Sequence, residues 1–574
     1  MSTSSPPATL PAAAPGQWWR NAVIYQVYPR SFADGNGDGT GDLAGVRARL
    51  PYLRDLGVDA VWFTPWYYSP LVDGGYDVAD YRSIDPAFGT LAEAEDLIAE
   101  ASRLGVRTIV DIVPNHVSDQ HEWFRKALAA GPGSPERERF WFRPGKGEDG
   151  SQMPTAWVSS FQGSTWTRTT DDDGTPGEWY LHLFTPQQPD LNWNHPDVRR
   201  EHEDILRFWF DRGVSGIRID SAALLVKDPA LPEVDDSPVR PGEHRPHPFT
   251  DRDELHDVYR SWRAVADSYP EPRLLVGEIW LPDARRFADY LRPDEMHTAF
   301  NFELMACPWD ATALRASIDS TLAAHALVGA PATWVLSNHD VTRPVTRYGR
   351  ADTAFAFDTK RFGTPTDLEL GTRRARAAAL LTAALPGSLY VYQGDELGLP
   401  EVEDLPDDAR QDPMFFRSGG VDPGRDGCRV PLPWHADPAR AFGFQDVPAT
   451  APPWLPQPVW WGRYAADAQE DDPGSMLSLY REALAVRRHE PGLRGESFAW
   501  VSLGAESGPA PAGLVEPSEP VTSSDLLAFA RDDVLCVVNL GTRDAPLPPG
   551  ELLVASADVS AGRLPPDVAA WLRR

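Results

Sequence analysis

Charged and polar side chains stand at the ends of several short apolar runs in this sequence. They occur in the segments DIVPNH, GIRID, LLVGEI and SNHD, and they are His116, Arg218, Asp220, Glu278, His339 and Asp340. The carboxyl ends of parallel strands meet at one face of a barrel, so we expect these side chains to converge there. Three carboxylates, two histidines and an arginine at equivalent strand ends indicate a catalytic site.

The spacing of these groups predicts different roles for two of the carboxylates. Arg218 and Asp220 are two residues apart, so both side chains point to the same face of a strand. A neighbouring guanidinium keeps a carboxylate ionised, which suits a nucleophile. Glu278 is expected near the negative charges of Asp220 and Asp340, which raise a carboxyl pKa and suit a proton donor. Such a division is the logic of retaining glycoside hydrolysis.

Eight apolar runs, several followed by a segment with helical periodicity, predict the elements that position these groups. Uninterrupted apolar runs are typical of strands buried on both faces, as in a parallel sheet. Eight such units favour a (β/α)8 TIM barrel in the α/β class. The runs are Ala22–Tyr28, Ala60–Pro65, Thr108–Val113, Gly216–Asp220, Leu274–Ile279, His297–Leu304, Thr333–Asn338 and Ser388–Gln393.

Changes in composition along the chain predict its domain organisation. Residues 1–16 are rich in Pro, Ala and Ser and predict a disordered arm. Loop-rich sequence after the third strand predicts an inserted domain, and alternating strands near the end predict an all-β domain, with a hairpin turn at Asp532–Asp533. The expected units are a barrel at 17–116 and 190–488 with an irregular insertion at about 394–458, the inserted domain at 117–189, and the β domain at 489–574.

Overall composition excludes several classes of partner. The 574 residues contain 84 Asp and Glu against 54 Lys and Arg, a net charge of −30 that disfavours nucleic acid and anionic membrane surfaces. Three cysteines provide neither a disulfide framework nor a thiolate zinc site. No apolar run is long enough to span a membrane, and the N-terminus does not read as a secretory signal, so we expect a cytoplasmic protein. Oligomeric state stays open.

Five motifs together resemble glycoside hydrolase family 13, the α-amylase family, in its oligo-1,6-glucosidase and α-glucosidase branch. They occur in family order, and the resemblance extends from about Trp18 to Trp434 with weaker support to the end. The motifs are DIVPNH (Asp111–His116), QPDLNW (Gln188–Trp193), GIRID (Gly216–Asp220), VGEIW (Val276–Trp280) and SNHD (Ser337–Asp340).

The resemblance implies a role for each catalytic candidate. Asp220 would be the nucleophile that forms a β-glucosyl-enzyme, and Glu278 the general acid and then base. Asp340 would bind sugar hydroxyls in the distorted transition state. Arg218 would orient the nucleophile.

The same resemblance implies which residues bind the terminal glucose. His116 and His339 would hydrogen-bond the sugar in subsite −1. Tyr76 would stack on it, with core packing as the alternative. Phe161 and Phe184 resemble aromatic walls of the pocket, and core packing is equally open for them.

A second pair of residues bears on the mode of attack. In the resembling branch the Asp of DGGY pairs with the Arg of GCRxPxxW, which are Asp73 and Arg429 in this chain. Such an ion pair would close the far end of subsite −1. A closed end admits only a chain terminus, so the resemblance implies exo cleavage that releases glucose.

The loop DGNGDGTGD alternates acidic residues and glycine after the first strand. Oxygen ligands at its first, third, fifth and ninth positions, with a backbone carbonyl at the seventh, suit a hard cation. We expect a structural Ca²⁺ or Mg²⁺, as the similar loop of the branch carries, against the alternative of a plain Gly-rich turn. The expected ligands are Asp34, Asn36, Asp38, the main chain of Thr40, and Asp42.

The residues that follow the nucleophile bear on substrate specificity. In the branch, Val at that position accompanies α-1,6 preference, and Ser221 here favours α-1,4. Endo-amylases of the family carry Lys-His shortly afterwards, where this chain has Ala223 and Leu224. The sequence therefore predicts a retaining exo-α-glucosidase that acts on short α-1,4-linked oligosaccharides such as maltose. The alternatives are a glucosyl transferase or isomerase (trehalose synthase, sucrose isomerase, transglucosidase), an oligo-1,6-glucosidase, and a non-catalytic partner of a transporter.

Overall fold

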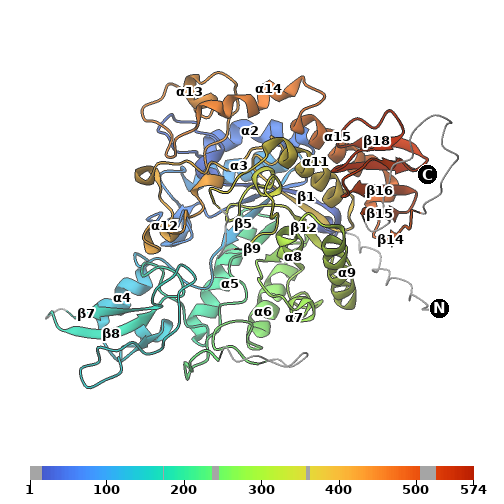
Figure 1. The fold of residues 1–574 in the computed structure, drawn as a ribbon. Coiled ribbons are helices and arrows are strands. Elements are labelled where there is room, and N and C mark those ends of the chain that lie inside the picture. The colour runs from blue at the N-terminus through green and yellow to red at the C-terminus, as the bar shows by residue number, and fades with distance from the viewer. Residues whose placement is uncertain (1–15, 172–173, 236–244, 357–361, 504–524) are drawn as a thin grey trace.

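Eight parallel strands form the central sheet of the protein (Figure 1). The computed structural model describes residues 16–171, 174–235, 245–356, 362–503 and 525–574, so nearly all of the arm expected at 1–16 lies outside the described residues. The sheet order β11-β10-β9-β5-β2-β1-β13-β12 curves into a nearly closed barrel, as the sequence predicted. The strands are β1 (Val23–Val27), β2 (Ala60–Phe63), β5 (Arg107–Ile112), β9 (Gly216–Ile219), β10 (Leu274–Gly277), β11 (Thr298–Ala299), β12 (Thr333–Val335) and β13 (Ser388–Tyr392).

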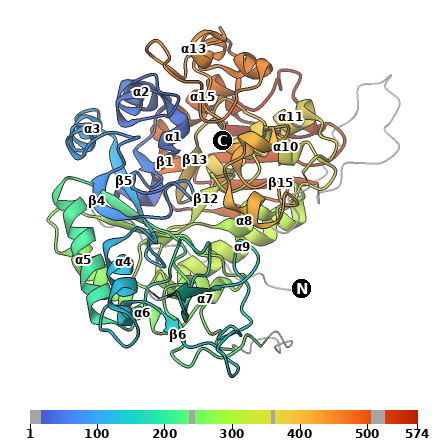
Figure 2. The same cartoon turned by 90° about the vertical axis from the view of Figure 1, so that its left-hand side faces the viewer.

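A helix follows each barrel strand and packs outside the sheet, as Figures 1 and 2 show. The first of them illustrate how the sequence sets their ends: Asp42 caps α2 by accepting from Gly45 N, and Thr90 forms a capping box with Glu93 at the start of α3. The eight helices are α2 (Leu43–Leu56), α3 (Leu91–Arg103), α5 (Pro196–Asp211), α6 (Leu255–Asp267), α7 (Ala284–Asp289), α9 (Ala311–Val328), α11 (Leu368–Ala384) and α15 (Met476–His489).

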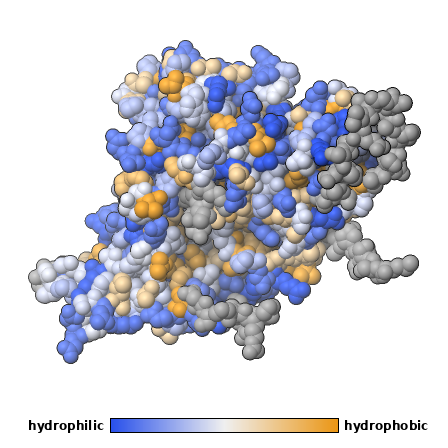
Figure 3. All heavy atoms as spheres, viewed as in Figure 1, coloured by the Kyte–Doolittle hydropathy of each residue, from blue (hydrophilic) through white to orange (hydrophobic). Residues whose placement is uncertain are grey.

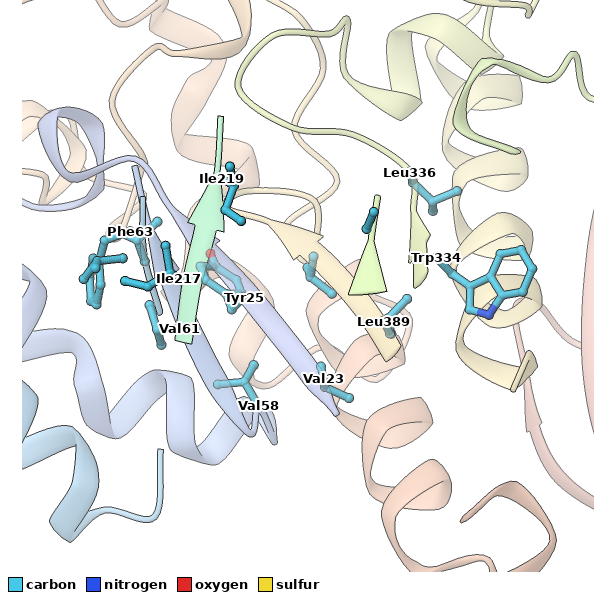
Figure 4. Packing of buried hydrophobic residues seen from close by; sticks show 14 of the residues in the cluster. Val23, Tyr25, Val58, Val61, Phe63, Ile217, Ile219, Trp334, Leu336 and Leu389 are labelled. Carbon is cyan, nitrogen blue, oxygen red and sulfur yellow. The ribbon is translucent and has the colours of Figure 1, made fainter. Parts of the chain in front are cut away.

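Apolar side chains fill both faces of the barrel strands. Tyr25 and Val27 of β1 pack outward beneath the helices, whereas Ile24 points into the barrel interior with Trp62 and Phe300. Figure 4 shows part of the outward layer, including Val61 and Ile217. Burial on both faces explains why the strands read as uninterrupted apolar runs in the sequence.

The barrel has a seam between its two end strands, β11 and β12, where the strand ladder is missing. The Thr333 hydroxyl bridges it by donating to the carbonyl of Ala299 and accepting from Asn301 N at 3.1 Å. The run predicted over His297–Leu304 is only partly a strand, because Asn301 caps α8 (Phe302–Ala306), which replaces its second half. The two end strands are therefore connected through the Thr333 side chain rather than through a ladder of backbone hydrogen bonds.

Loops at the carboxyl ends of the strands carry the remaining elements. A hairpin of β3 (Tyr67–Tyr68) and β4 (Asp80–Ile84) follows β2, and an antiparallel sheet in the order β6-β8-β7 lies between β5 and α5. These strands are β6 (Phe142–Arg143), β7 (Trp166–Thr170) and β8 (Pro176–Leu181), preceded by α4 (Glu122–Ala130). The short helices of the other connections are α1 (Pro29–Phe32), α10 (Pro344–Tyr348), α12 (Pro413–Arg417), α13 (Ala439–Phe442), α14 (Ala466–Glu470) and α16 (Pro491–Arg494).

The C-terminal region is an all-β unit, as the sequence predicted, and packs on α11 at one side of the barrel (Figure 1). The hairpin turn expected at Asp532–Asp533 connects two antiparallel strands, with Arg531 paired to Val534. The strands are β14 (Ala499–Trp500), β15 (Leu526–Arg531), β16 (Val534–Asn539), β17 (Ala545–Pro546), β18 (Glu551–Ala555), β19 (Arg563–Leu564) and β20 (Val568–Arg573).

Hydrophobic residues are scattered among hydrophilic ones on the face of the molecule shown in Figure 3. Among the helices that the structure describes, none combines the length and the apolar character needed to cross a membrane.

Candidate active site

A cavity of about 370 Å³ opens where the barrel strands end. The three carboxylates predicted to be catalytic converge on it, together with most of the residues predicted to bind sugar. The predicted residues that line it are Asp73, Tyr76, His116, Phe161, Phe184, Asp220, Glu278, His339 and Asp340.

Each of these side chains is positioned by the end of a barrel strand or by a loop that follows one. Asp220 follows β9 directly and Glu278 follows β10. His339 and Asp340 lie shortly after β12. His116 lies just beyond β5, and its bridge to Asp190 joins the start of the inserted segment to its end. Residues distant in the chain therefore meet because parallel strands end at a common face.

Arg218 lies beneath the cavity floor and is 1% exposed. One of its terminal nitrogens donates to Asp220 Oδ1 at 2.7 Å and to Asp111 Oδ1 at 2.9 Å. The other donates to Glu278 Oε2 at 2.8 Å. A single guanidinium thus bridges the two carboxylates predicted to be nucleophile and acid.

The sequence predicted that Arg218 keeps Asp220 ionised, but other groups around Asp220 oppose this effect. Burial raises the pKa of Asp220 well above its ordinary value, and the neighbouring charges of Glu278 and Asp111 raise it further against the lowering effect of Arg218. Burial also raises the pKa of Asp111 to about 7. Three carboxylates share one cation, so burial and mutual repulsion favour the protonated form of a carboxyl in this group more than water does.

Glu278 is held by donors on both carboxylate oxygens. Its Oε2 accepts from Arg218 and from Ser221 N, which is 3.0 Å away, and its Oε1 accepts from the indole of Trp280 at 3.0 Å. Ser221 adopts a left-handed backbone conformation with a φ of 46°. Non-glycine residues seldom adopt this conformation, and here it follows the strand end that carries the predicted nucleophile.

Asp340 faces two arginines and a histidine. Its Oδ1 accepts from Arg429 at 2.9 Å and from Arg425 at 3.1 Å, and Nε2 of His339 lies 3.4 Å from Oδ2. Burial opposes ionisation, but His339, Arg425, Arg429 and Arg218 outweigh it and lower the pKa of Asp340. This carboxylate therefore stays ionised.

The ion pair expected between Asp73 and Arg429 is replaced by a different pairing. Asp73 pairs with Arg425 at 2.6 Å, whereas Arg429 pairs with Asp340. The reason is that Arg429 Nε donates to the carbonyl of His339 at 2.8 Å, which directs its guanidinium toward Asp340. Arg425 lies four residues earlier, is fixed by Asp412 at 2.6 Å, and reaches Asp73 instead.

Tyr76 and His116 also line the cavity. The Tyr76 hydroxyl donates to Asp111 Oδ2 at 3.0 Å, and its ring stacks on His339 at 5.2 Å. Nε2 of His116 lies 3.1 Å from the carbonyl of Tyr76, and its ring contacts Phe184 at 5.0 Å. Phe161 and Phe184 line the cavity and pack edge to face at 5.2 Å.

Several residues of the site were missed by the sequence analysis. Asp111, Gln188 and Trp280 lie inside the motifs DIVPNH, QPDLNW and VGEIW, so the sequence marked their positions although no role was predicted for them. Gln188 Nε2 donates to Asp73 Oδ2 at 3.0 Å. Arg425 lies in the same short segment as Arg429, and only the fold distinguishes which one meets Asp73. The other lining residues not nominated are Ser160, Thr250 and Met414.

The predicted metal loop is ordered by its own side chains. Asp34 accepts from the backbone of Gly37 and Gly39, and Asp42 accepts from Gly35 and Gly45. Burial, with the charges of Asp34 and Asp38, raises the pKa of Asp42 to about 6. Among the described residues, no three His, Cys, Asp or Glu side chains converge as a metal site.

Comparison with known proteins places the chain in a family. The model of the alpha amylase catalytic domain matches residues 26–495, and a domain of unknown function (DUF3459) matches 523–571. The chain belongs to the α-amylase family, glycoside hydrolase family 13. This membership confirms the resemblance and identifies the protein as a glycoside hydrolase.

Individual relatives of this α-amylase family enzyme are named for different activities. A probable alpha-glucosidase of Rhizobium meliloti (strain 1021) is 37% identical, covering 92% of this chain and 90% of the relative. An oligo-1,6-glucosidase of Parageobacillus thermoglucosidasius is 32% identical, covering 82% and 84%. The crystal structure of XgtA, an alpha-glucosyl transfer enzyme, has a TM-score of 0.79 and 34% identity and covers 97% of this chain and 99% of that one. The family enzyme is thus similar to both glucosidases and glucosyl transferases.

Replacing Asp220 by Asn should stabilise the protein. Burial raises the folded-state pKa of this carboxyl above its unfolded value, so ionising it costs free energy at neutral pH. We expect the free energy of unfolding, measured by urea denaturation at pH 7, to rise, because Arg218 keeps Asp111 and Glu278 as partners. The gain should disappear below about pH 4, where the carboxyl is protonated in both states.

Asp412→Asn is the matched control, and it should change the free energy of unfolding in the opposite direction. Burial disfavours the charge of Asp412, but Arg425 outweighs burial and lowers the pKa of this carboxyl. Neutralising it should therefore destabilise the protein at pH 7. Equal destabilisation by both variants would contradict the charge balance described for Arg218.

Proposed function

We propose that the protein is a retaining exo-α-glucosidase that releases glucose from the non-reducing end of short α-1,4-linked gluco-oligosaccharides such as maltose. The observation that carries this proposal is the bridge that Arg425 forms between Asp73 and Asp340 at the cavity wall. The proposed substrate is a neutral oligosaccharide, which needs hydroxyl acceptors and aromatic surfaces rather than a charged partner.

In the first step, Glu278 donates its proton to the glycosidic oxygen while Asp220 attacks the anomeric carbon. The carbon–oxygen bond to the leaving sugar breaks, and an ester bond to Asp220 forms with inverted configuration. In the second step, Glu278 takes a proton from water, whose oxygen attacks the anomeric carbon and releases Asp220. Two inversions return an α-anomer, and Arg218 stabilises the charges that appear on both carboxylates.

A closed end of the cavity supports the exo mode. Asp73 and Arg425 are 3% and 7% exposed, and Asp412 anchors the arginine from behind. A sugar chain that continued past the terminal glucose would have to displace this buried ion pair. Breaking such a pair leaves an uncompensated buried charge, which costs several kcal/mol (about 3–5).

Preference for an α-1,4 linkage rests on Ser221, which lines the cavity directly after Asp220. The small polar residue leaves room beside the scissile bond where the branch with α-1,6 preference carries Val. The alternative is a preference for α-1,6 linkages, since one relative is named an oligo-1,6-glucosidase.

Glucosyl transfer is a second candidate function. The cavity mouth carries apolar side chains, Leu224, Trp280 and Met414, on which an acceptor sugar could stack while water is excluded. Similarity to an alpha-glucosyl transfer enzyme supports this candidate. A non-catalytic transporter partner is disfavoured, since Asp220, Glu278 and Asp340 are all retained around one cavity.

Product analysis with a substrate panel tests the proposal. Incubation with maltose, maltotriose, isomaltose, sucrose and trehalose should release glucose fastest from the α-1,4-linked sugars, and early NMR spectra should show the α-anomer. Maltotriose labelled at its reducing end should yield labelled maltose first. Disaccharides or longer products with little free glucose at high maltose would favour the transferase, and a first-formed β-anomer would contradict retention.

Azide rescue separates the roles of the two carboxylates. With an activated α-glucoside, Glu278→Ala should use azide in place of water and give α-glucosyl azide. Asp220→Gly should use azide in place of the nucleophile and give β-glucosyl azide. Each variant should lose at least about 10³-fold in rate without azide. Exchanged product configurations would reverse the assignment.

We propose further that the loop at residues 34–42 binds a structural Ca²⁺ or Mg²⁺. The oxygen-bearing side chains of Asp34, Asn36, Asp38 and Asp42, alternating along one short loop, support a cation there, which would brace the loop without taking part in catalysis. Chelation with EDTA should lower the melting temperature by several degrees, and added Ca²⁺ should restore it. Asp38→Asn should reproduce the loss. An unchanged melting temperature, with no metal found by elemental analysis, would contradict this proposal.

A further inference from the structure

Gln26 contacts the active site from a strand that contributes no other polar group to it. The residue lies in β1, is 1% exposed, and shares the inward face with Ile24, which packs inside the barrel. Its side-chain amide Nε2 lies 2.7 Å from Nδ1 of His339, a residue 313 positions later in the chain. The sequence pattern does not mark Gln26 as a site residue, because only the closed barrel brings β1 beside the loop after β12.

The other nitrogen of His339 faces a carboxylate. Nε2 lies 3.4 Å from Oδ2 of Asp340, which is ionised and can only accept a hydrogen bond. Burial, together with Arg429, Arg218 and Arg425, lowers the pKa of His339 well below its ordinary value despite Asp340, so the ring is neutral. A neutral imidazole has one N–H. For Nε2 to donate to Asp340, Nδ1 must be the acceptor, and it then needs a donor.

Aromatic rings fix the plane of His339 but not its tautomer. Tyr76 stacks on one face with ring centroids 5.2 Å apart and an interplanar angle of 5°. Tyr28 is also stacked on the ring, at 6.0 Å. Stacking gives no preference between the two nitrogens. The amide of Gln26 is therefore the group that distinguishes them.

We propose that Gln26 is a positioning residue that holds His339 as the Nε2–H tautomer, so that the N–H is on the nitrogen that lies beside Asp340. The proposal rests on the proposed function, in which His339 binds the terminal glucose. The tautomer of His339 can be measured without any enzymatic activity, so this part of the proposal does not depend on the proposed function.

The test combines spectroscopy with kinetics. Enzyme labelled with ¹⁵N-histidine should show His339 with an unprotonated Nδ1 and a protonated Nε2, with the signal assigned by its loss in His339→Asn. Gln26→Met keeps the shape but removes the donor, so both tautomers should appear. Gln26→Glu places an acceptor there, so Nδ1–H should dominate. In Gln26→Met we expect kcat on maltose to fall at least about tenfold with a smaller change in KM.

Ser388→Ala is the matched control. Ser388 is fully buried in the neighbouring strand β13, and its hydroxyl has no hydrogen-bond partner among the described residues, so this variant should keep both the parental spectrum and the parental kinetics. A protonated Nδ1 in the parent, or a Gln26→Met enzyme with unchanged spectrum and kcat, would overturn the proposal. A parent that shows the expected tautomer but hydrolyses no α-glucoside would contradict the proposed function alone.

Discussion

The active site depends on one buried guanidinium shared by three carboxylates. Arg218 contacts Asp111, Asp220 and Glu278 from a strand inside the barrel, at 2.7–2.9 Å. Without it, three like charges would face each other away from water, which folding could not tolerate. With it, the group still carries more carboxylates than cations, and burial, together with the charges of Glu278 and Asp111, raises the pKa of Asp220. The contact with Arg218 therefore allows the carboxylates to lie close together in a buried site.

The rest of the fold serves to place groups around this centre. Parallel strands bring the carboxylates to one face, and the loops after them close the cavity. A second cluster, in which Arg425 and Arg429 face Asp73, Asp340 and Asp412, has more nearly balanced charge. Asp340 and Asp412 stay ionised there, because the arginines outweigh the effect of burial on their pKa values. The two clusters thus differ in their balance of burial and charge, which raises the pKa of Asp220 but lowers the pKa values of Asp340 and Asp412.

Much of this arrangement could be predicted from the sequence, and the remainder could not for physical reasons. Apolar runs predicted all eight barrel strands, because strands buried on both faces leave an uninterrupted pattern. The shortest, β11, was overestimated because Asn301 begins a helix inside the apolar run. Side chains at strand ends were predicted to converge because barrel topology requires it.

Pairings between loops are different, since no periodicity encodes them. The sequence could not distinguish Arg425 from Arg429 as the partner of Asp73, because both lie in one irregular segment and the choice depends on a hydrogen bond to the carbonyl of His339. The contact of Gln26 with His339 could not be predicted either, because only the closed barrel brings β1 beside the loop after β12. Asp111 was missed because it lies within β5, fully buried and outside the cavity lining, where it meets Arg218 rather than the sugar site.

The central claim is that Asp220, held beside Glu278 by Arg218, forms the covalent intermediate. The most direct test is to trap that intermediate with 5-fluoro-α-glucosyl fluoride and to map the labelled peptide by mass spectrometry. The account predicts one fluoroglucosyl group on the peptide that contains Asp220, and none in Asp220→Asn. A label on another carboxylate, or rapid turnover of maltose with no label at any position, would contradict it.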